Sequence, residues 1–235
     1  MRVIITFLFT VAGLFFCLQA EDILEKIDGA RNTAASYYMK ITITDHDDKG
    51  KIDRAVYDSY FSGYEKSVLI CREGKNKKMK ILMKENDMWT CLPGSHRSIR
   101  ITPQQRLMGQ ASNGDVAKIA FSQEYSVLES TASGNNLVLT LRAKKQSATY
   151  QRIVLTVAPD TYIMIKADFF LLSGKHFKSA EYFYDLNGER PRLTQVKIID
   201  TVKTGRWTTL DYGLLQERQI ADRIFNVTYL PEWNG

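Results

Sequence analysis

The sequence predicts an all-β protein, a sandwich or barrel made from one long series of short strands. Between residues 36 and 212, β-branched and aromatic residues alternate with polar ones, which is the period of two expected for half-buried strands. Turns rich in Gly, Asn and Pro separate these segments at short intervals. The chain has no long helical pattern, so a parallel sheet with crossover helices is excluded.

One short helix is predicted before the strands, at residues 21–34. It begins with acidic residues, and Ile23, Leu24 and Ile27 recur at helical spacing, so one face is expected to lie on the sheet. A weaker helical segment is predicted at 116–121, and residues 213–225 are expected to cover the edge or mouth of the sheet. The predicted strands are 38–44, 52–61, 67–71, 79–83, 87–91, 97–102, 125–130, 136–142, 152–157, 162–170, 176–184, 193–200 and 206–212.

Residues 1–20 have the pattern of a secretory signal peptide, with a basic start and an apolar run that is too short for a comfortable bilayer span. Two outcomes are open: signal peptidase cleaves after Ala20, or Cys17 receives a lipid anchor. Cleavage is favoured, because bulky residues precede Cys17 where a lipobox has a small one. No Pro/Ser-rich linker or repeat divides residues 21–235, which we interpret as one β domain in the periplasm.

The net charge of the whole chain is +6, and its pI is about 9.1. Removing residues 1–20 removes only Arg2, so the mature balance is 31 basic minus 26 acidic residues, or +5. Such a balance favours an anionic partner such as lipid headgroups or lipopolysaccharide, whereas export argues against nucleic acid. The alternative is a basic surface without a function, since the Lys/Arg clusters at 72–80 and 142–145 fall at predicted strand ends and turns.

The chain lacks the residue patterns of an enzyme or a metal site. Its three histidines are scattered, and no phosphate-binding loop, dinucleotide fingerprint or nucleophile elbow is present. The acidic turn around His46 could bind a hard cation weakly, but a solvated turn is favoured, because it lacks the Gly and Glu of a calcium loop. Cys71 and Cys91 flank a common middle strand about 9–10 Å apart, too far for a disulfide, and are predicted to be free and buried.

The most unusual stretch is residues 86–115. Two short predicted strands end at Pro103, and the following QQRLMGQASNGD at 104–115 is too long for a hairpin turn and has no strong period. Ordered loops of this length are usually functional. The apolar pair Leu107 and Met108 suggests a flap over a cavity, whereas periodicity alone favours a surface loop that inserts both side chains into the core.

This stretch resembles a known family. The run W-x-x-L-P-G-S-x-R-x-I-R-I from Trp89, then P-x-x-R-x-M-G and S-N-G-D, is similar to the signature of the LolA-like outer membrane lipoprotein-sorting proteins. Residues 220–230 are similar to the family's closing segment, and order and spacing agree from about Ile23 to Leu230. The aspartate-rich stretch that often follows the loop is reduced here to D-V-A-K at 115–118, which leaves the role of that segment open.

The resemblance implies a mainly β fold: a single curved antiparallel sheet that forms an incomplete β-barrel, with short helices plugging or covering its open side. Large side chains such as Tyr57, Phe61 and Phe169 would fill a closed small barrel, but in an incomplete barrel they would leave an apolar pocket for acyl chains. The residues alone do not separate a filled interior from a hollow one, and the resemblance favours the hollow one.

The implied function is a periplasmic carrier or chaperone that binds acyl chains for lipoprotein sorting or lipid transport in the cell envelope. No cofactor is expected. An alternative is a sensor or accessory module that docks on an inner-membrane transporter or an envelope signalling protein, and peripheral membrane contact fits both. The residues expected to form the apolar cavity and flap are Trp89, Leu92, Ile99, Ile101, Leu107 and Met108, and those expected to meet headgroups or polar lid groups are Arg97 and Arg100.

Overall fold

A computed structural model describes residues 22–31, 34–85, 87–117 and 120–235. The predicted signal peptide and Cys17 lie outside these residues. A helix at 22–31 precedes one 14-stranded antiparallel sheet. The strands of this sheet are β1 (Ser36–His46), β2 (Ile52–Ser62), β3 (Lys66–Glu73), β4 (Lys80–Lys84), β5 (Asp87–Cys91), β6 (Ile99–Ile101), β9 (Tyr125–Ser133), β10 (Asn136–Ala143), β11 (Arg152–Val157), β12 (Met164–Phe170), β13 (His176–Asp185), β14 (Arg192–Asp200), β15 (Trp207–Tyr212) and β16 (Gln216–Glu217).

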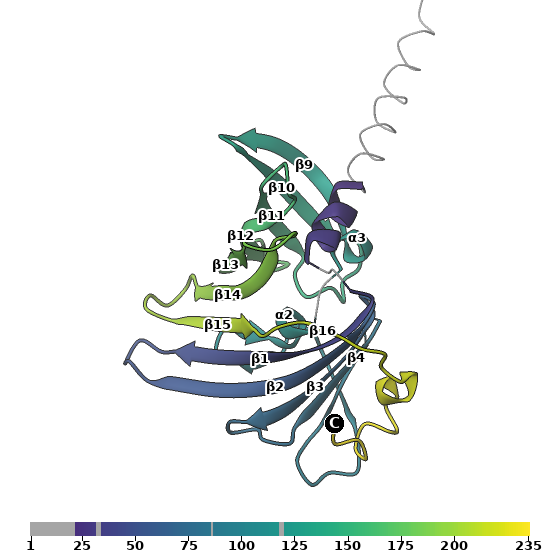
Figure 1. The fold of residues 1–235 in the computed structure, drawn as a ribbon. Coiled ribbons are helices and arrows are strands. Elements are labelled where there is room, and N and C mark those ends of the chain that lie inside the picture. Colours follow the sequence, from purple (N-terminus) through teal and green to yellow (C-terminus); the bar gives the residue numbers. More distant parts are fainter. Residues whose placement is uncertain (1–21, 32–33, 86, 118–119) are drawn as a thin grey trace, which may run out of the picture.

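The sheet consists of two meanders joined at β1. In space the strands run β6-β5-β4-β3-β2-β1-β15-β14-β13-β12-β11-β10-β9, and β16 pairs with the start of β1. The join between β1 and β15 is in register from Ile41 opposite Tyr212 to His46 opposite Trp207. Within the described residues the end strands β6 and β9 do not pair with each other, so the barrel is incomplete, as predicted. Figure 1 shows the two halves curving apart, with the helix at 22–31 and α3 on the open side.

The concave side of the sheet holds the main hydrophobic core. Leu24 and Ile27 of the N-terminal helix are almost fully buried in it, as their helical spacing predicted. Inward residues of alternating strands complete this core, for example Ile41, Leu139 and Ile153, each with no exposed surface. The short helix and the inner strand faces therefore bury their apolar sides against each other.

The C-terminal segment covers the opposite face of the first meander. Only β16 lies along the sheet's strands; beyond it, η1 (Asp222–Phe225) and the residues up to 233 pack on the outer side of β2–β5. Phe225 and Leu230 are buried there, and the Lys80 ammonium donates hydrogen bonds to the backbone oxygens of Leu230 (3.1 Å) and Pro231 (2.7 Å). The expectation that 213–225 would cover the edge or mouth was thus wrong for most of this segment.

The loop predicted at 104–115 contains local structure that its sequence did not indicate. β7 (Arg106–Met108) and β8 (Ala111–Ser112) form a separate small hairpin, and α2 (Asn113–Val116) follows at once. The helical segment predicted at 116–121 is also displaced, because α2 ends at its start and α3 (Phe121–Glu124) begins at its end.

Cys71 and Cys91 are both buried and free, which confirms the prediction. They point to opposite sides of the sheet: Cys71 belongs to the inner core, and Cys91 lies under the C-terminal segment. No helix among the described residues has the length and apolarity needed to cross a membrane.

Candidate ligand cavity

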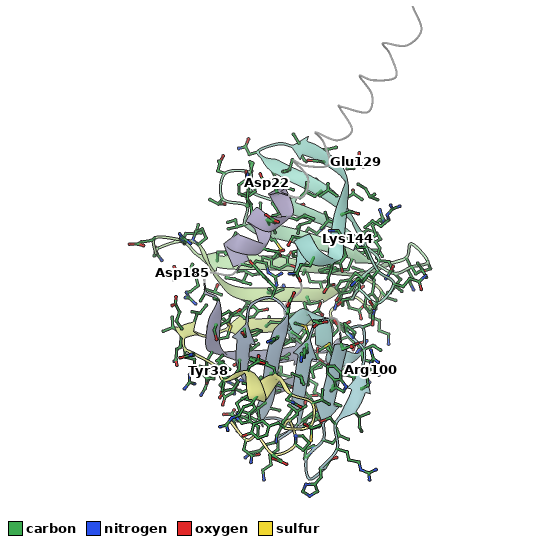
Figure 2. All side chains as sticks on the ribbon, turned by 90° about the vertical axis from the view of Figure 1, so that its right-hand side faces the viewer. Asp22, Tyr38, Arg100, Glu129, Lys144 and Asp185 are labelled. Carbon is green, nitrogen blue, oxygen red and sulfur yellow. The ribbon has the colours of Figure 1, made fainter. Side chains whose placement is uncertain are left out.

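A cavity of about 320 Å³ opens at one end of the barrel. It lies between the end of the N-terminal helix, the beginning of β1, the turn joining β13 to β14, and the chain that follows β15. Figure 2 shows the molecule from this end, with Tyr38 of β1 and Asp185 at the end of β13 labelled. The lining residues are Ala30, Arg31, Tyr37, Met39, Phe61, Asp115, Val116, Glu189, Arg190, Pro191, Arg192, Leu193, Tyr212, Gly213 and Leu215.

Strand alternation creates the apolar part of the wall. Tyr37 and Met39 line the cavity, whereas Tyr38 between them points to the other face, where its hydroxyl donates to Asp58 (2.7 Å). The Tyr37 ring stacks on Phe61 of the neighbouring strand, with 4.9 Å between the ring centroids. Such a surface suits an apolar ligand.

A smaller pocket of about 30 Å³ adjoins the cavity and shares Arg31, Asp115 and Tyr212 with it. Core residues such as Phe169 and Leu210 form its other walls, so it lies deeper in the barrel. The Arg31 guanidinium lies 5.3 Å from the centroid of the Phe121 ring. Burial alone would lower the pKa of Arg31, but nearby tyrosine oxygens and Asp28 raise it above its usual value, so this side chain is charged.

Tyrosines surround this charge. Burial raises the pKa values of Tyr37, Tyr182 and Tyr212, and that of Tyr184 to about 12, although Arg31 opposes the rise in each case. All four hydroxyls are therefore protonated at neutral pH and able to donate hydrogen bonds.

The floor of the cavity is fixed by a buried ion pair. Asp115, on α2, accepts from the Lys178 ammonium of β13 (2.5 Å), from the Tyr150 hydroxyl (2.5 Å) and from the Ser112 backbone and hydroxyl (2.7 and 2.9 Å). Lys178 also donates to the Gln110 oxygen (2.8 Å). Burial lowers the pKa of Lys178, and the Asp115 carboxylate opposes that shift. Both charges are compensated, so neither is left for a ligand.

The rim of the cavity carries charged and exposed apolar residues. The turn between β13 and β14 contributes Glu189 and Arg190, and Arg192 pairs with Asp185 at 3.2 Å. Leu214, between the lining residues Gly213 and Leu215, has 71% of its surface exposed.

Comparison with known proteins identifies this architecture. A family model described only as "Uncharacterized protein" matches residues 63–232. A crystal structure of a LolA superfamily protein from Nitrosomonas europaea is 30% identical, with a TM-score of 0.81, covering 89% of this chain and 98% of that one. The chain belongs to the LolA superfamily.

Two further structures share the fold of this LolA superfamily protein. A DUF1329 family protein from Desulfovibrio piger has a TM-score of 0.76 at 18% identity, covering 91% of this chain and 98% of its own. A domain of a proposed outer membrane lipoprotein-sorting protein from Vibrio parahaemolyticus has a TM-score of 0.74 at 14% identity. The match covers 92% of this chain and 99% of that one. No curated protein sequence matches the chain.

The residues predicted for the cavity of this LolA superfamily protein do not line the cavity of about 320 Å³. Trp89 packs on the outer cluster under the C-terminal segment, and Leu92 and Ile99 are 47% and 51% exposed. Ile101, Leu107 and Met108 do pack against the inner core, but none of them lines the cavity of about 320 Å³. Of the two predicted polar contacts, Arg97 is exposed and Arg100 forms an exposed ion pair with Asp87.

The predicted flap is held in place along its length. Gln104 donates to the Ala148 oxygen (2.6 Å), and the Gln110 backbone donates to the Thr208 hydroxyl (2.7 Å). Gly109 has a φ of +54°, and a Cβ there would collide with Asp45 and Thr208. The segment therefore forms a plug, and only its end at Asp115 reaches the cavity.

Some of the residues that line the cavity could be anticipated from the sequence. The alternation of Tyr37, Tyr38 and Met39 predicts which two face inward, and Phe61 was among the large apolar residues expected on curved strands. Nothing in the pattern distinguishes a cavity wall from an ordinary core position, because both require inward apolar side chains. The turn at 189–192 carries only ordinary turn residues.

The structure also brings Ser179, His176 and Asp168 together on the outer face of β12 and β13. Ser179 Oγ lies 2.6 Å from Asp168 Oδ1 and 3.2 Å from His176 Nε2, and His176 Nε2 lies 3.3 Å from the same Asp168 oxygen. In a catalytic triad the histidine stands between the other two and accepts the serine proton. Here the serine donates to the aspartate directly, so the cluster is a surface hydrogen-bond network.

Proposed function

We propose that this protein is a periplasmic carrier or chaperone. It binds an acyl chain of a lipoprotein or a lipid in the cavity of about 320 Å³ and transfers it between components of the envelope. The observation that carries the proposal is an apolar-walled cavity in a LolA superfamily fold. The predicted signal peptide and the net charge of +6 support a role in the envelope, close to anionic lipids.

The size and walls of the cavity support a ligand with one chain. Ligand pockets usually have volumes of about 300–1,000 Å³, and this one is at the lower end of that range. Each buried methylene contributes roughly 0.8 kcal/mol of affinity, so one chain suffices for stable but reversible binding. No covalent step is needed, and the carrier is not an enzyme.

Release is proposed to occur at the mouth rather than at the plug. The Gln104–Asp115 segment is bonded to Ala148, Thr208 and Lys178, whereas the turn at 186–191 and the chain at 213–215 border the opening. Movement of these two segments would widen the mouth without breaking the buried ion pair.

The decisive experiment is native mass spectrometry of the protein purified from its own envelope, followed by lipid extraction. We expect about one bound lipid or acylated peptide per chain. Leu215→Trp, which places a large ring in the cavity, should reduce the bound fraction about tenfold or more. Leu214→Trp is the matched control, because Leu214 is exposed beside the lining. An apo mass for the wild type, with no uptake of added lipid, would exclude a carrier.

A role as an accessory module is favoured by a different feature, the free edge of β9. Residues 128–133 of this end strand are exposed, including Leu128 at 46%, and an exposed edge can accept a strand from a partner protein. A stoichiometric second chain in the same mass spectra, without lipid, would support this function instead.

A further inference from the structure

The inner end of the cavity, where the deep pocket adjoins it, is polar. Arg31, Tyr182 and Tyr212 line the deep pocket, and Arg31 and Tyr212 also line the large cavity. Val116, Leu193 and Leu215 line the large cavity but not the deep pocket. A ligand that extends from the large cavity into the deep pocket would therefore pass these apolar groups and end beside a cation and two phenols.

The hydroxyls of Tyr182 and Tyr212 have no hydrogen-bond partner among the described residues. They are also not sealed off, because the buried and unpartnered side-chain oxygens of that part of the chain belong only to Ser36, Ser59 and Ser67. Both oxygens therefore reach the pocket space. Leaving donors of this kind unsatisfied is costly in a dry site, so a ligand or water is expected to bind them.

The charge in the pocket favours an anion. Arg31 is half-buried and charged, and Asp115, which also lines the pocket, is paired with Lys178. Asp28, the other nearby carboxylate, accepts from the backbone of Phe121 and Ser122 at the start of α3, at 2.9 Å each. The guanidinium and two phenols thus present donors to the same small volume.

We propose that the ligand is a single-chain carboxylate, such as a free fatty acid, bound with its carboxylate against Arg31, Tyr182 and Tyr212. This inference rests on the proposed carrier function and names its ligand class. A pocket of about 30 Å³ has room for roughly two water-sized atoms, which matches the two oxygens of a carboxylate better than the four of a phosphate. The chain then extends past Tyr37, Met39 and Phe61 toward the mouth.

The test is calorimetric titration of the delipidated protein with dodecanoate, methyl dodecanoate and dodecyl phosphate. We expect dodecanoate to bind at least about tenfold more tightly than methyl dodecanoate, because a hydrogen bond to a charged group contributes at least that much. It should also bind more tightly than dodecyl phosphate, whose headgroup is larger than the pocket of about 30 Å³. Tyr182→Phe and Tyr212→Phe should each lower dodecanoate affinity about tenfold and change methyl dodecanoate binding much less. Tyr60→Phe is the control, since Tyr60 is buried on the other face of the sheet.

The phenylalanine variants keep the shape of the tyrosine rings and are expected to fold normally. The affinity of Arg31→Met for dodecanoate provides a second, independent measurement. Equal affinity for acid and ester, unchanged in both tyrosine variants, would overturn the carboxylate site while leaving the carrier function standing. Dodecyl phosphate binding as tightly as dodecanoate would overturn the selectivity. Failure of all three ligands to bind would contradict the carrier function itself.

Discussion

Buried charged residues are stabilised in two different ways in this molecule, and the half-buried Glu124 shows neither. Lys178 is paired with Asp115, and Lys80 is satisfied by two backbone oxygens of the C-terminal segment. Glu124 lies on α3. Its burial, together with the negative charge of Asp28, raises its pKa from 4.5 to about 7, and Lys145 only partly opposes this rise. A carboxyl of this kind makes stability depend on pH.

Glu124→Gln should remove that dependence. The folded protein holds the proton more tightly than the unfolded chain, so the free energy of unfolding falls as pH rises from about 4.5 to about 7. The difference between these pKa values corresponds to about 3 kcal/mol. Urea unfolding at pH 5 and pH 8 should show a smaller difference between the two pH values in Glu124→Gln than in the wild type. An equal difference in both proteins would contradict the assignment, and Glu129→Gln on the exposed edge strand β9 is the control.

At the level of elements, the strands were predictable and the plug was not. Between residues 36 and 212, inward and outward residues alternate strongly enough that each predicted sheet strand overlaps an observed one, usually within two residues. β7, β8 and α2 have no such period, because their positions depend on hydrogen bonds to Ala148, Thr208 and Lys178 far along the chain. A local pattern cannot encode these partners.

The C-terminal segment is an element whose contribution can be measured separately. Phe225 is 2% exposed against the outer face of β2–β5, so Phe225→Ala should cost about 3–5 kcal/mol and loosen this cover. Cys91, under the cover, should then react with a thiol reagent much faster than in the wild type, while Cys71 in the inner core stays protected.

Mass spectrometry after partial thiol labelling distinguishes the two cysteines. Phe183→Ala is a suitable control, because Phe183 is 44% exposed on β13 and does not belong to the outer cluster. Labelling of Cys71 before Cys91 in Phe225→Ala would show that the inner core opens first and that the C-terminal segment is not an independent cover.

For the molecule as a whole, the family resemblance predicted the incomplete barrel, whereas the residues predicted for the site are not those that line the cavity of about 320 Å³. Trp89 and Ile99 belong to the most distinctive motif, yet that motif builds the first meander and the plug. The cavity arises where Arg31, Tyr37, Leu193 and Tyr212, distant in sequence, meet at one end of the sheet. Such a convergence depends on sheet order and curvature, which a single sequence does not specify.

Because of this convergence, the proposed ligand binding would depend on the whole fold, and thermal stability should report it. A ligand that binds only the folded barrel raises the free energy of unfolding by about 2.7 kcal/mol at a concentration of 100 times Kd. Dodecanoate should therefore raise the Tm of the delipidated protein in a concentration-dependent way. Dodecanoate should not raise the Tm of Leu215→Trp, because the added ring fills the cavity. Without ligand, the Tm of this variant should be close to that of the wild type, because the ring occupies space that is otherwise empty. An undiminished increment in Leu215→Trp would place the ligand outside the cavity, on a surface such as the exposed edge of β9.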